Sequence, residues 1–360
     1  MNNNGRRPRY GNNSFLDEQS DRSQKSGYKR TRRRSIPFGY IIVADILIAA
    51  VVLLFFYLSS YVWKKDVKPE VLNNPGPNIS QPADNNHDIG DDPNEDTPDV
   101  PTSTPDNSDW RAKFADKFTD GEVVKTDNSY QSANVNVSID KVEKDGTVYF
   151  IADIYLADIK YFKTAFGKNE LGQNEFVHHN LKNNNGIVGI NGDNCRDNPC
   201  LIIRNGSYYD WHQSSTFDTL VMYNDGSMET ISGPDVDFEA IKAEAPYQTW
   251  GFGPMLLDSN GQPMSEFNST VAGSKNPRTA IGYYEPGHYC FVAVDGRRED
   301  YSLGLTMTEL SQLMFDLGCK RAFNLDGGGS TQMAYIDEYV NIPSKDRTVN
   351  DMIYITDNAE

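Results

Sequence analysis

The stretch from Cys319 to Gln332 reads Cys-Lys-Arg-Ala-Phe-Asn-Leu-Asp-Gly-Gly-Gly-Ser-Thr-Gln. A short apolar strand here runs into Asp326 and then into three consecutive glycines. Glycine costs backbone entropy, so a packed domain keeps three in a row where the chain needs positive φ or where a ligand approaches the main chain. The amides of such a loop can form an anion-binding concavity, which Asn324, Asp326 and Ser330 would surround with polar groups. The stretch predicts a phosphate or sugar site at a strand end, and the alternative is a tight turn capped by Asp326.

The residues before this strand predict a helix from Thr306 to Gly318. Thr306 and Glu309 fit a capping box, Gly318 fits the position after the last turn, and four apolar residues recur at helical spacing: Leu310, Leu313, Met314 and Leu317. We expect this helix to pack on the sheet and to fix the glycine loop. Residues 331–336 alternate like a strand, which argues against a Walker-type phosphate loop because that loop opens a helix.

Upstream of the helix the sequence is rich in strand and turn signals. Residues 133–139 and 147–156 flank a turn at Asp145-Gly146, and two further hairpins are predicted at Asn205-Gly206 and Asp225-Gly226. Residues 186–191 form a short apolar run that would bring Asn191 and Asp193 to a strand end. The order of elements predicts an α+β domain with a mixed or antiparallel sheet and packed helices.

The first hundred of the 360 residues differ from the rest. Residues 1–35 hold ten basic and three acidic residues and predict a disordered cytoplasmic tail. Residues 36–63 predict one transmembrane helix, because the segment from Phe38 to Trp63 carries a single charge, Asp45. Residues 64–109 are rich in Pro and Asp and predict a disordered linker. Residues 110–360 are then one extracellular domain, anchored in the cell membrane by a single pass with the N-terminus inside.

Two more stretches place polar residues at the ends of apolar strands, around Asn276-Pro-Arg-Thr-Ala and around Val294-Asp-Gly-Arg. Together with the glycine loop they resemble the phosphodiester glycosidase family, which includes bacterial proteins of exopolysaccharide biosynthesis. The resemblance spans roughly residues 110–356. Its matching positions, in order, are Asn191-Gly-Asp193, Pro277 to Ala280, Val294 to Arg297, Asn324 to Ser330, Asn341 and Arg347.

The resemblance implies hydrolysis of the bond between a sugar and a phosphodiester, in a cell-surface or exopolysaccharide glycan. Arg278 and Arg297 suit phosphate binding, because a guanidinium binds phosphate through two hydrogen bonds. Candidates for activating water or stabilising positive charge at the anomeric carbon are Asp193, Asp295 and Asp326. The remaining candidates for substrate binding are Asn191, Thr279, Asn324, Gly327, Gly328, Gly329, Ser330 and Arg347. Sequence alone does not assign acid, base or nucleophile.

Each of these roles has an alternative. The two arginines could pair with Asp295 and Asp326 in a structural network, or the three acids could hold calcium or magnesium, which prefer oxygen ligands. No other cofactor is expected. Outside the membrane, Cys195 and Cys200 could form a local disulfide, and Cys290 and Cys319 could be buried thiols or a second bridge.

Nucleic acid is not expected as a partner. Residues 1–35 contribute +7 to the formal net charge of −17, so the rest of the chain carries −24 and would repel a phosphorylated glycan at long range. A working site must therefore be a local basic island, which Arg278, Arg297, Arg298 and Arg347 would make if they converge. Two other functions stay open: a cell-wall glycan-binding module without catalysis, and a glycosyl transferase acting on the same linkage.

Overall fold

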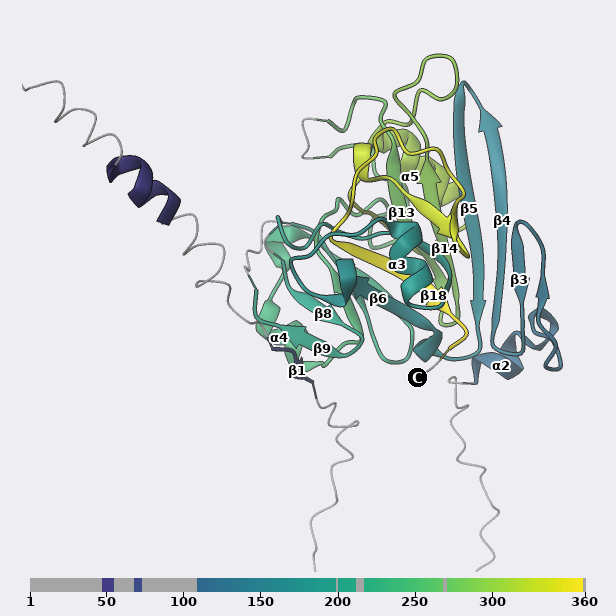
Figure 1. Cartoon of the computed structure of the whole chain (residues 1–360). Helices are drawn as coiled ribbons and strands as arrows, with labels where there is room; N and C mark the ends of the chain where they lie inside the picture. Colours follow the sequence, from purple (N-terminus) through teal and green to yellow (C-terminus); the bar gives the residue numbers. More distant parts are fainter. Residues whose placement is uncertain are drawn as a thin grey trace, which may run out of the picture. The chain divides into compact units, whose positions relative to one another are not determined.

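The computed structural model describes residues 47–54, 68–72, 109–198, 200–211, 217–267 and 271–358. The chain divides into two units, Met1–Lys65 and Asp66–Glu360. Figure 1 shows the helices and strands of the described residues. In the first unit residues 47–54 are helical and exposed. Among the described residues, no helix has both the length and the apolar character needed to cross a membrane. The expected tail 1–35, most of 36–63 and most of the linker 64–109 lie outside the described residues.

The second unit is built on two antiparallel sheets. The first has seven strands in the order β15-β13-β14-β5-β4-β3-β2. Its strands are β2 (Val124–Lys125), β3 (Ser129–Gln131), β4 (Val135–Lys144), β5 (Thr147–Leu156), β13 (Arg278–Glu285), β14 (His288–Val294) and β15 (Arg321–Asn324). The expected hairpin at Asp145-Gly146 is confirmed, since β4 and β5 pair from Lys144 and Thr147 outward.

The second sheet has five strands in the order β17-β16-β7-β18-β6. They are β6 (Phe162–Phe166), β7 (Gly186–Asn191), β16 (Met333–Tyr335), β17 (Glu338–Tyr339) and β18 (Asp351–Thr356). Buried residues of both sheets form one hydrophobic cluster, which includes Phe150 and Phe291 from the first and Ile190 and Ile353 from the second. The unit is therefore held together by apolar faces of sheets buried against each other.

Two smaller sheets complete the unit, in the orders β1-β9-β8 and β11-β10-β12. Their strands are β1 (Glu70–Val71), β8 (Ile202–Arg204), β9 (Ser207–Tyr209), β10 (Thr219–Met222), β11 (Met228–Ile231) and β12 (Gln248–Trp250). β1 belongs to the segment expected to be linker, and its two residues pair with Ser207 and Tyr208. Every strand pairing in the described part of the chain is antiparallel, so the α+β expectation holds in its antiparallel form.

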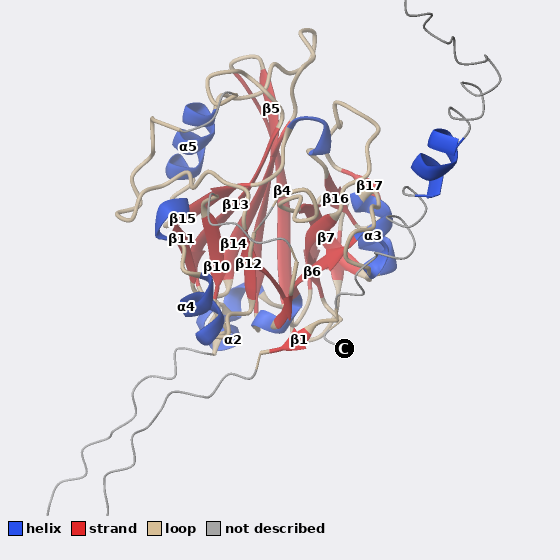
Figure 2. Cartoon of the chain, turned by 90° about the vertical axis from the view of Figure 1, so that its left-hand side faces the viewer, coloured by secondary structure: helices blue, strands red, loops and turns tan. Residues whose placement is uncertain are grey.

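The helices are short and cover the sheets from different sides (Figure 2). They are α2 (Trp110–Lys113), α3 (Val177–Asn183), α4 (Phe238–Ala243) and α5 (Met307–Asp316), and the 3₁₀ turns are η2 (Ala115–Lys117), η3 (Ile159–Tyr161), η4 (Gly167–Asn169), η5 (Gly233–Asp235) and η6 (Gly328–Ser330). α5 confirms the predicted helix, including both hydrogen bonds of the Thr306–Glu309 capping box. It buries Leu310 and Met314 against Val292 and Ala322 of the first sheet.

Antiparallel pairing explains how distant polar residues meet. Arg278, at the start of β13, pairs with Val294, at the end of β14, and Ala280 pairs with Asn324, at the end of β15. The start of β13 therefore lies at the same edge as the ends of its two neighbours. In the second sheet, Asn191 at the end of β7 pairs with Met352 near the start of β18. These edges carry the loops in which the candidate site residues lie.

Candidate active site

A cleft of about 720 Å³ opens at this edge of the first sheet. We call it the larger cleft. It is lined by the glycine loop and by residues from eight other segments, and its lining includes Asp218, Phe252, Asn276, Arg278, Arg297, Met307, Asn324, Asp326, Lys345 and Arg347. A second cavity of about 240 Å³, the smaller cleft, is lined by Asn174, Asn191, Asn194, Arg196, Ser330, Asn350 and Asp351 together with Asp326 and Arg347. Because Asp326 and Arg347 line both, the two clefts meet at these residues.

The glycine loop is shaped by its contacts with Arg297. Gly328 has a φ of +62°, and a Cβ there would lie 2.9 Å from Nη2 of Arg297. The positive φ and the close approach both favour glycine at this position. The Gly328 amide donates to the Pro277 carbonyl over 2.9 Å, and the Ser330 amide donates to the Gly327 carbonyl over 3.1 Å. These two amides are thus used inside the fold, which leaves fewer loop amides for an anion than the sequence implies.

Arg278 is a buried cation at the wall of the larger cleft. Its Nε donates to the Leu305 carbonyl over 3.0 Å, and its Nη2 donates to the carbonyls of Val271 and Ser274 over 2.9 and 3.0 Å. Burial, together with the nearby Arg297, lowers the pKa of Arg278 to about 10. Three carbonyl acceptors hold the guanidinium in place but do not neutralise its charge.

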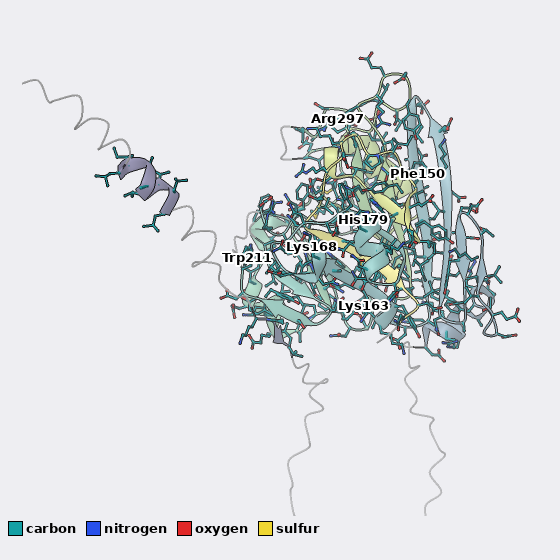
Figure 3. All side chains as sticks on the ribbon, viewed as in Figure 1. Phe150, Lys163, Lys168, His179, Trp211 and Arg297 are labelled. Carbon is teal, nitrogen blue, oxygen red and sulfur yellow. The ribbon has the colours of Figure 1, made fainter. Side chains whose placement is uncertain are left out.

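Three further cations surround the same cleft. Arg297, at a φ of +64°, directs Nε and Nη2 to the neutral Oδ1 of Asn276 over 3.1 and 3.0 Å. Lys345 packs its stem against Gly329, and Arg347 lies where the clefts meet. Among the ion pairs formed by described residues, none involves these three cations or Arg278. Figure 3 marks Arg297 among the loops of this end of the domain.

The cluster of basic residues expected from the sequence is therefore present, but one of its four members differs from the expectation. Arg278, Arg297 and Arg347 converge on the larger cleft. Arg298 instead donates from Nη2 to the Pro343 carbonyl over 3.0 Å and lines neither cleft. Lys345 takes its place, and sequence reasoning missed it although it lies two residues before Arg347.

Asp326 is the carboxylate at the junction of the clefts. Burial raises its pKa, while the nearby Ser330 hydroxyl and Arg347 guanidinium act to lower it. Its backbone is fixed from both sides: its amide donates to the Gly192 carbonyl over 3.2 Å, and its carbonyl accepts from Nδ2 of Asn191 over 2.7 Å. Asp326 is therefore a partly buried, positioned carboxylate between two cavities that a substrate could occupy.

Asn191 and Thr279 link the two sheets near Asp326 through a hydrogen bond. Thr279 is fully buried and donates its hydroxyl to Oδ1 of Asn191 over 2.8 Å. The same Oδ1 accepts from the Gln332 amide over 3.1 Å. Asn324 is also buried; its Nδ2 donates to the Gly253 carbonyl over 2.7 Å, while its Oδ1 has no partner among described residues. Asn324 thus offers an acceptor at the larger cleft, whereas Thr279 lies outside both clefts.

The structure places Asp295 in an internal network rather than in either cleft. It accepts from Nδ2 of Asn341 over 2.8 Å, from the Ile342 amide over 3.0 Å and from the Tyr301 hydroxyl over 3.0 Å. Burial raises the pKa of Asp295, and these three hydrogen bonds oppose the rise. The carboxylate anchors the chain segment that leads towards Lys345.

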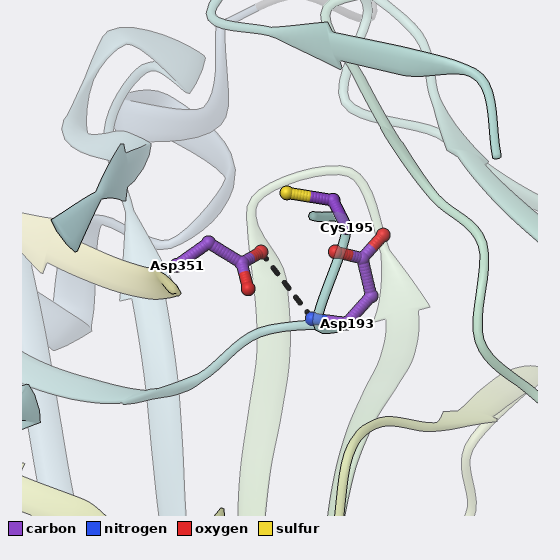
Figure 4. Close-up of side chains that lie close together, drawn as sticks. All are labelled: Asp193, Cys195 and Asp351. Atoms are coloured by element: carbon purple, nitrogen blue, oxygen red, sulfur yellow. Dashed lines mark hydrogen bonds between the residues drawn. The ribbon is translucent and has the colours of Figure 1, made fainter. Parts of the chain in front are cut away.

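Asp193 lines neither cleft and lies in a buried cluster with Cys195 and with Asp351, which lines the smaller cleft (Figure 4). Nη2 of Arg204 donates to Oδ1 of Asp193 over 2.8 Å and to Oδ2 of Asp351 over 3.3 Å. Burial and the neighbouring Asp193 raise the pKa of Asp351, while Arg204 opposes the rise. The arginine supplies the positive charge that two buried carboxylates require.

This cluster is the group of acids and thiols, within the described ranges, whose atoms lie close enough to share one ion. Its composition does not fit calcium or magnesium, which take oxygen ligands, because one of its three members is a thiol and Arg204 already binds both carboxylates. Asp295 and Asp326 are not part of it. All four cysteines are free and buried, so the structure shows neither a Cys195–Cys200 nor a Cys290–Cys319 disulfide.

Sequence reasoning also missed Asp218, the second carboxylate of the larger cleft. Its oxygens accept from the Gly233 amide over 2.9 Å and from the Met255 amide over 3.0 Å. It precedes β10 without a motif that would distinguish it from other aspartates. The apolar lining of Phe252 and Met307 was likewise not indicated by any local pattern.

Comparison with known proteins agrees with the motifs. Residues 180–356 match the family model described as phosphodiester glycosidase. The SPbeta prophage-derived uncharacterized protein YomE of Bacillus subtilis (strain 168) is 30% identical over 168 residues, which are 44% of this chain and 26% of that protein. The chain thus spans about a quarter of the length of this curated relative.

A solved structure shows a similar fold at low identity. The catalytic domain of zebrafish N-acetylglucosamine-1-phosphodiester alpha-N-acetylglucosaminidase, auto-inhibited by its pro-peptide, has a TM-score of 0.50 at 17% identity, over 67% of this chain and 86% of that one. A hypothetical protein from Synechocystis has a TM-score of 0.49 at 12% identity, over 62% of each chain. The family match and the motifs at Asn191, Arg278, Arg297 and Asp326 lead to one conclusion: residues 180–356 of this chain belong to the phosphodiester glycosidase family.

Proposed function

We propose that the domain hydrolyses the glycosidic bond of a sugar-1-phosphodiester in a cell-surface or exopolysaccharide glycan. The observation that carries this proposal is the charge of Arg278, which forms no ion pair with a described residue, is 5% exposed and lies beside the second cation Arg297. Burying an ion without a counter-ion costs several kcal/mol. A fold that keeps such a group at a cleft wall is suited to an anionic ligand, and a guanidinium suits phosphate in particular.

The reaction then needs little acid catalysis. The oxygen of a water molecule bonds to the anomeric carbon, the bond from that carbon to the phosphate oxygen breaks, and the electron pair leaves with the phosphate. The product is a phosphomonoester with a second pKa of about 6, so it departs without full protonation. Arg278, Arg297 and Lys345 stabilise the charge that develops on it. The proton of the attacking water passes to Asp326 and from there to solvent.

Activity should depend on pH through Asp326. Its pKa is raised by burial, so the carboxyl becomes protonated at a higher pH than an ordinary aspartate. A protonated carboxyl cannot accept a proton from water, so kcat/KM is expected to fall as pH drops through this raised pKa. A pH profile of kcat/KM measures this, and activity that stays constant down to the usual aspartate range would contradict the role.

Arg297→Gln is expected to weaken substrate binding. The change removes a cation that faces the larger cleft, and a hydrogen bond to a charged group contributes about 1.5–3 kcal/mol, so KM for a sugar-1-phosphodiester should rise roughly ten- to hundred-fold. Arg321→Gln is the matched control, because Arg321 starts β15 at its other end and donates to the Lys320 carbonyl. Equal kinetics for the two variants would argue against a phosphate role for Arg297.

Products distinguish hydrolysis from the two alternatives. With the full chain and N-acetylglucosamine-1-phosphodiester, the linkage named for the zebrafish enzyme, free sugar indicates hydrolysis. A new glycoside, formed when a second sugar is added as the hydroxyl acceptor, indicates transfer. Binding without product indicates a glycan-binding module. The proposal requires free sugar to be the main product.

We also propose that the chain is anchored in the cell membrane by residues 36–63, with the domain outside. The support is the apolar composition of Phe38–Trp63 and the excess of Lys and Arg before it. Protease added to intact cells should remove the domain and leave residues 1–35 protected. Protection of both ends would contradict this topology.

A further inference from the structure

The two clefts that meet at Asp326 and Arg347 differ in charge. The larger cleft alone receives Arg278, Arg297 and Lys345, which form no ion pair with described residues. A phosphate would gain charge-assisted hydrogen bonds there. The larger cleft is therefore the anion-binding side of the site.

The smaller cleft is electrically balanced and rich in amides. Of its own charged residues, Arg196 pairs with Asp197 over 2.8 Å, and Asp351 pairs with Arg204 over 3.3 Å. Its remaining polar side chains include Asn174, Asn194 and Asn350. Side-chain amides both donate and accept hydrogen bonds, which matches the hydroxyl groups of a neutral sugar.

Asn350 gives this cleft an unused acceptor. The residue is 4% exposed, its Nδ2 donates to Oδ1 of Asn194, and its Oδ1 has no partner among described residues. A buried acceptor without a donor destabilises the fold by about 1–3 kcal/mol. Since Asn350 lines the cleft, a hydroxyl of a bound ligand can satisfy it.

We propose that the smaller cleft binds the sugar ring, and that the larger cleft binds the phosphate and the glycan attached to it. The bond between them then lies at Asp326, the carboxylate common to both clefts. The volumes agree with this division, because about 240 Å³ is below the usual range for drug-sized ligands and suits a single ring, whereas about 720 Å³ leaves room for phosphate and a further unit. This assignment rests on the proposed function and adds Asn350 as a residue for sugar recognition.

Separate binding of the two halves of the substrate tests the division. Phenyl phosphate represents the phosphate half, and free N-acetylglucosamine, glucose and galactose represent the sugar half, each titrated into the full chain and followed by NMR. Asn350→Leu is expected to weaken the best-bound sugar about ten-fold and phenyl phosphate less than two-fold. Arg297→Gln is expected to do the reverse, and Asn183→Leu, at an exposed position of α3, should change neither.

Opposite responses of the two variants support the division, since a folding defect would weaken both ligands together. If Asn350→Leu weakens both, Asn350→Ala repeats the test with a smaller change. Three results would each overturn the proposal. The first is loss of phosphate binding in both asparagine variants, and the second is sugar binding that depends on Arg297 but not on Asn350. The third is that none of the three sugars binds to the unaltered chain. Turnover of a sugar-1-phosphodiester is measured separately, so a chain that binds as described but does not turn over would refute the proposed function and leave the division standing.

Discussion

Asp326→Asn is expected to lower kcat about a hundred- to ten-thousand-fold, the usual range for loss of a positioned acid or base. Asparagine has nearly the same shape but cannot take a proton from water. The backbone of residue 326 is held by Gly192 and Asn191 through main-chain groups, so the substitution leaves these hydrogen bonds in place. KM should change little, because the cations of the larger cleft remain.

Asp326→Asn should be at least as stable to unfolding as the unaltered chain. Burial raises the pKa of Asp326 in the folded chain, so the ionised carboxyl costs the folded state free energy above that pKa, and this cost disappears as pH falls. Asparagine removes the cost at every pH. We expect a melting temperature equal to or above that of the unaltered chain, whereas Asp300→Asn, at an exposed loop position, should leave kcat within two-fold. Full activity of Asp326→Asn would remove Asp326 from the mechanism.

Arg204→Met is expected to cost about 3–5 kcal/mol of folding free energy, the range measured when one partner of a buried ion pair is removed. Its guanidinium is 1% exposed and binds both Asp193 and Asp351. It also donates from Nη1 to the Thr249 carbonyl, which ties β8 to β12. Methionine fills much of the volume but leaves two buried carboxylates without a counter-charge.

Chemical denaturation measures the folding free energy lost in Arg204→Met, and Arg196→Met serves as the control. Arg196 pairs with Asp197 at the surface, where an ion pair contributes about 0–1 kcal/mol. Adding Asp351→Asn to Arg204→Met should recover part of the loss, because it removes one uncompensated charge. If Arg204→Met costs no more than Arg196→Met, the network is not a structural support of the site.

The sequence predicted what local patterns encode. α5, its capping box and the hairpin between β4 and β5 depend on residues close together in the chain, and all three are confirmed. The glycine loop also indicated a strand-end site, since three glycines and an aspartate are informative without tertiary contacts. The antiparallel order of β15, β13 and β14 then explains why separate motifs meet.

The different positions of the aspartates could not be predicted from local sequence patterns. Asp193 and Asp295 stand at strand ends as Asp326 does, but their partners, Arg204 and Asn341, come from other segments and turn both side chains inward. Asp218 comes directly before β10 and Asn350 directly before β18, so their positions at the clefts depend on how these two strands pack. Which carboxylate faces a cavity is a property of tertiary packing, which local sequence does not contain.

Hydrolysis in ¹⁸O-labelled water tests the central claim most directly. If the cations of the larger cleft hold the phosphate while water attacks the anomeric carbon at Asp326, the full chain will convert N-acetylglucosamine-1-phosphodiester to a free sugar that carries the label on its anomeric hydroxyl. Mass spectrometry of both products locates the label. Label in the phosphate would mean that the bond between phosphorus and the sugar oxygen is cleaved, and release of sugar 1-phosphate would mean that the ester to the second alcohol is cleaved. Either result would contradict the account.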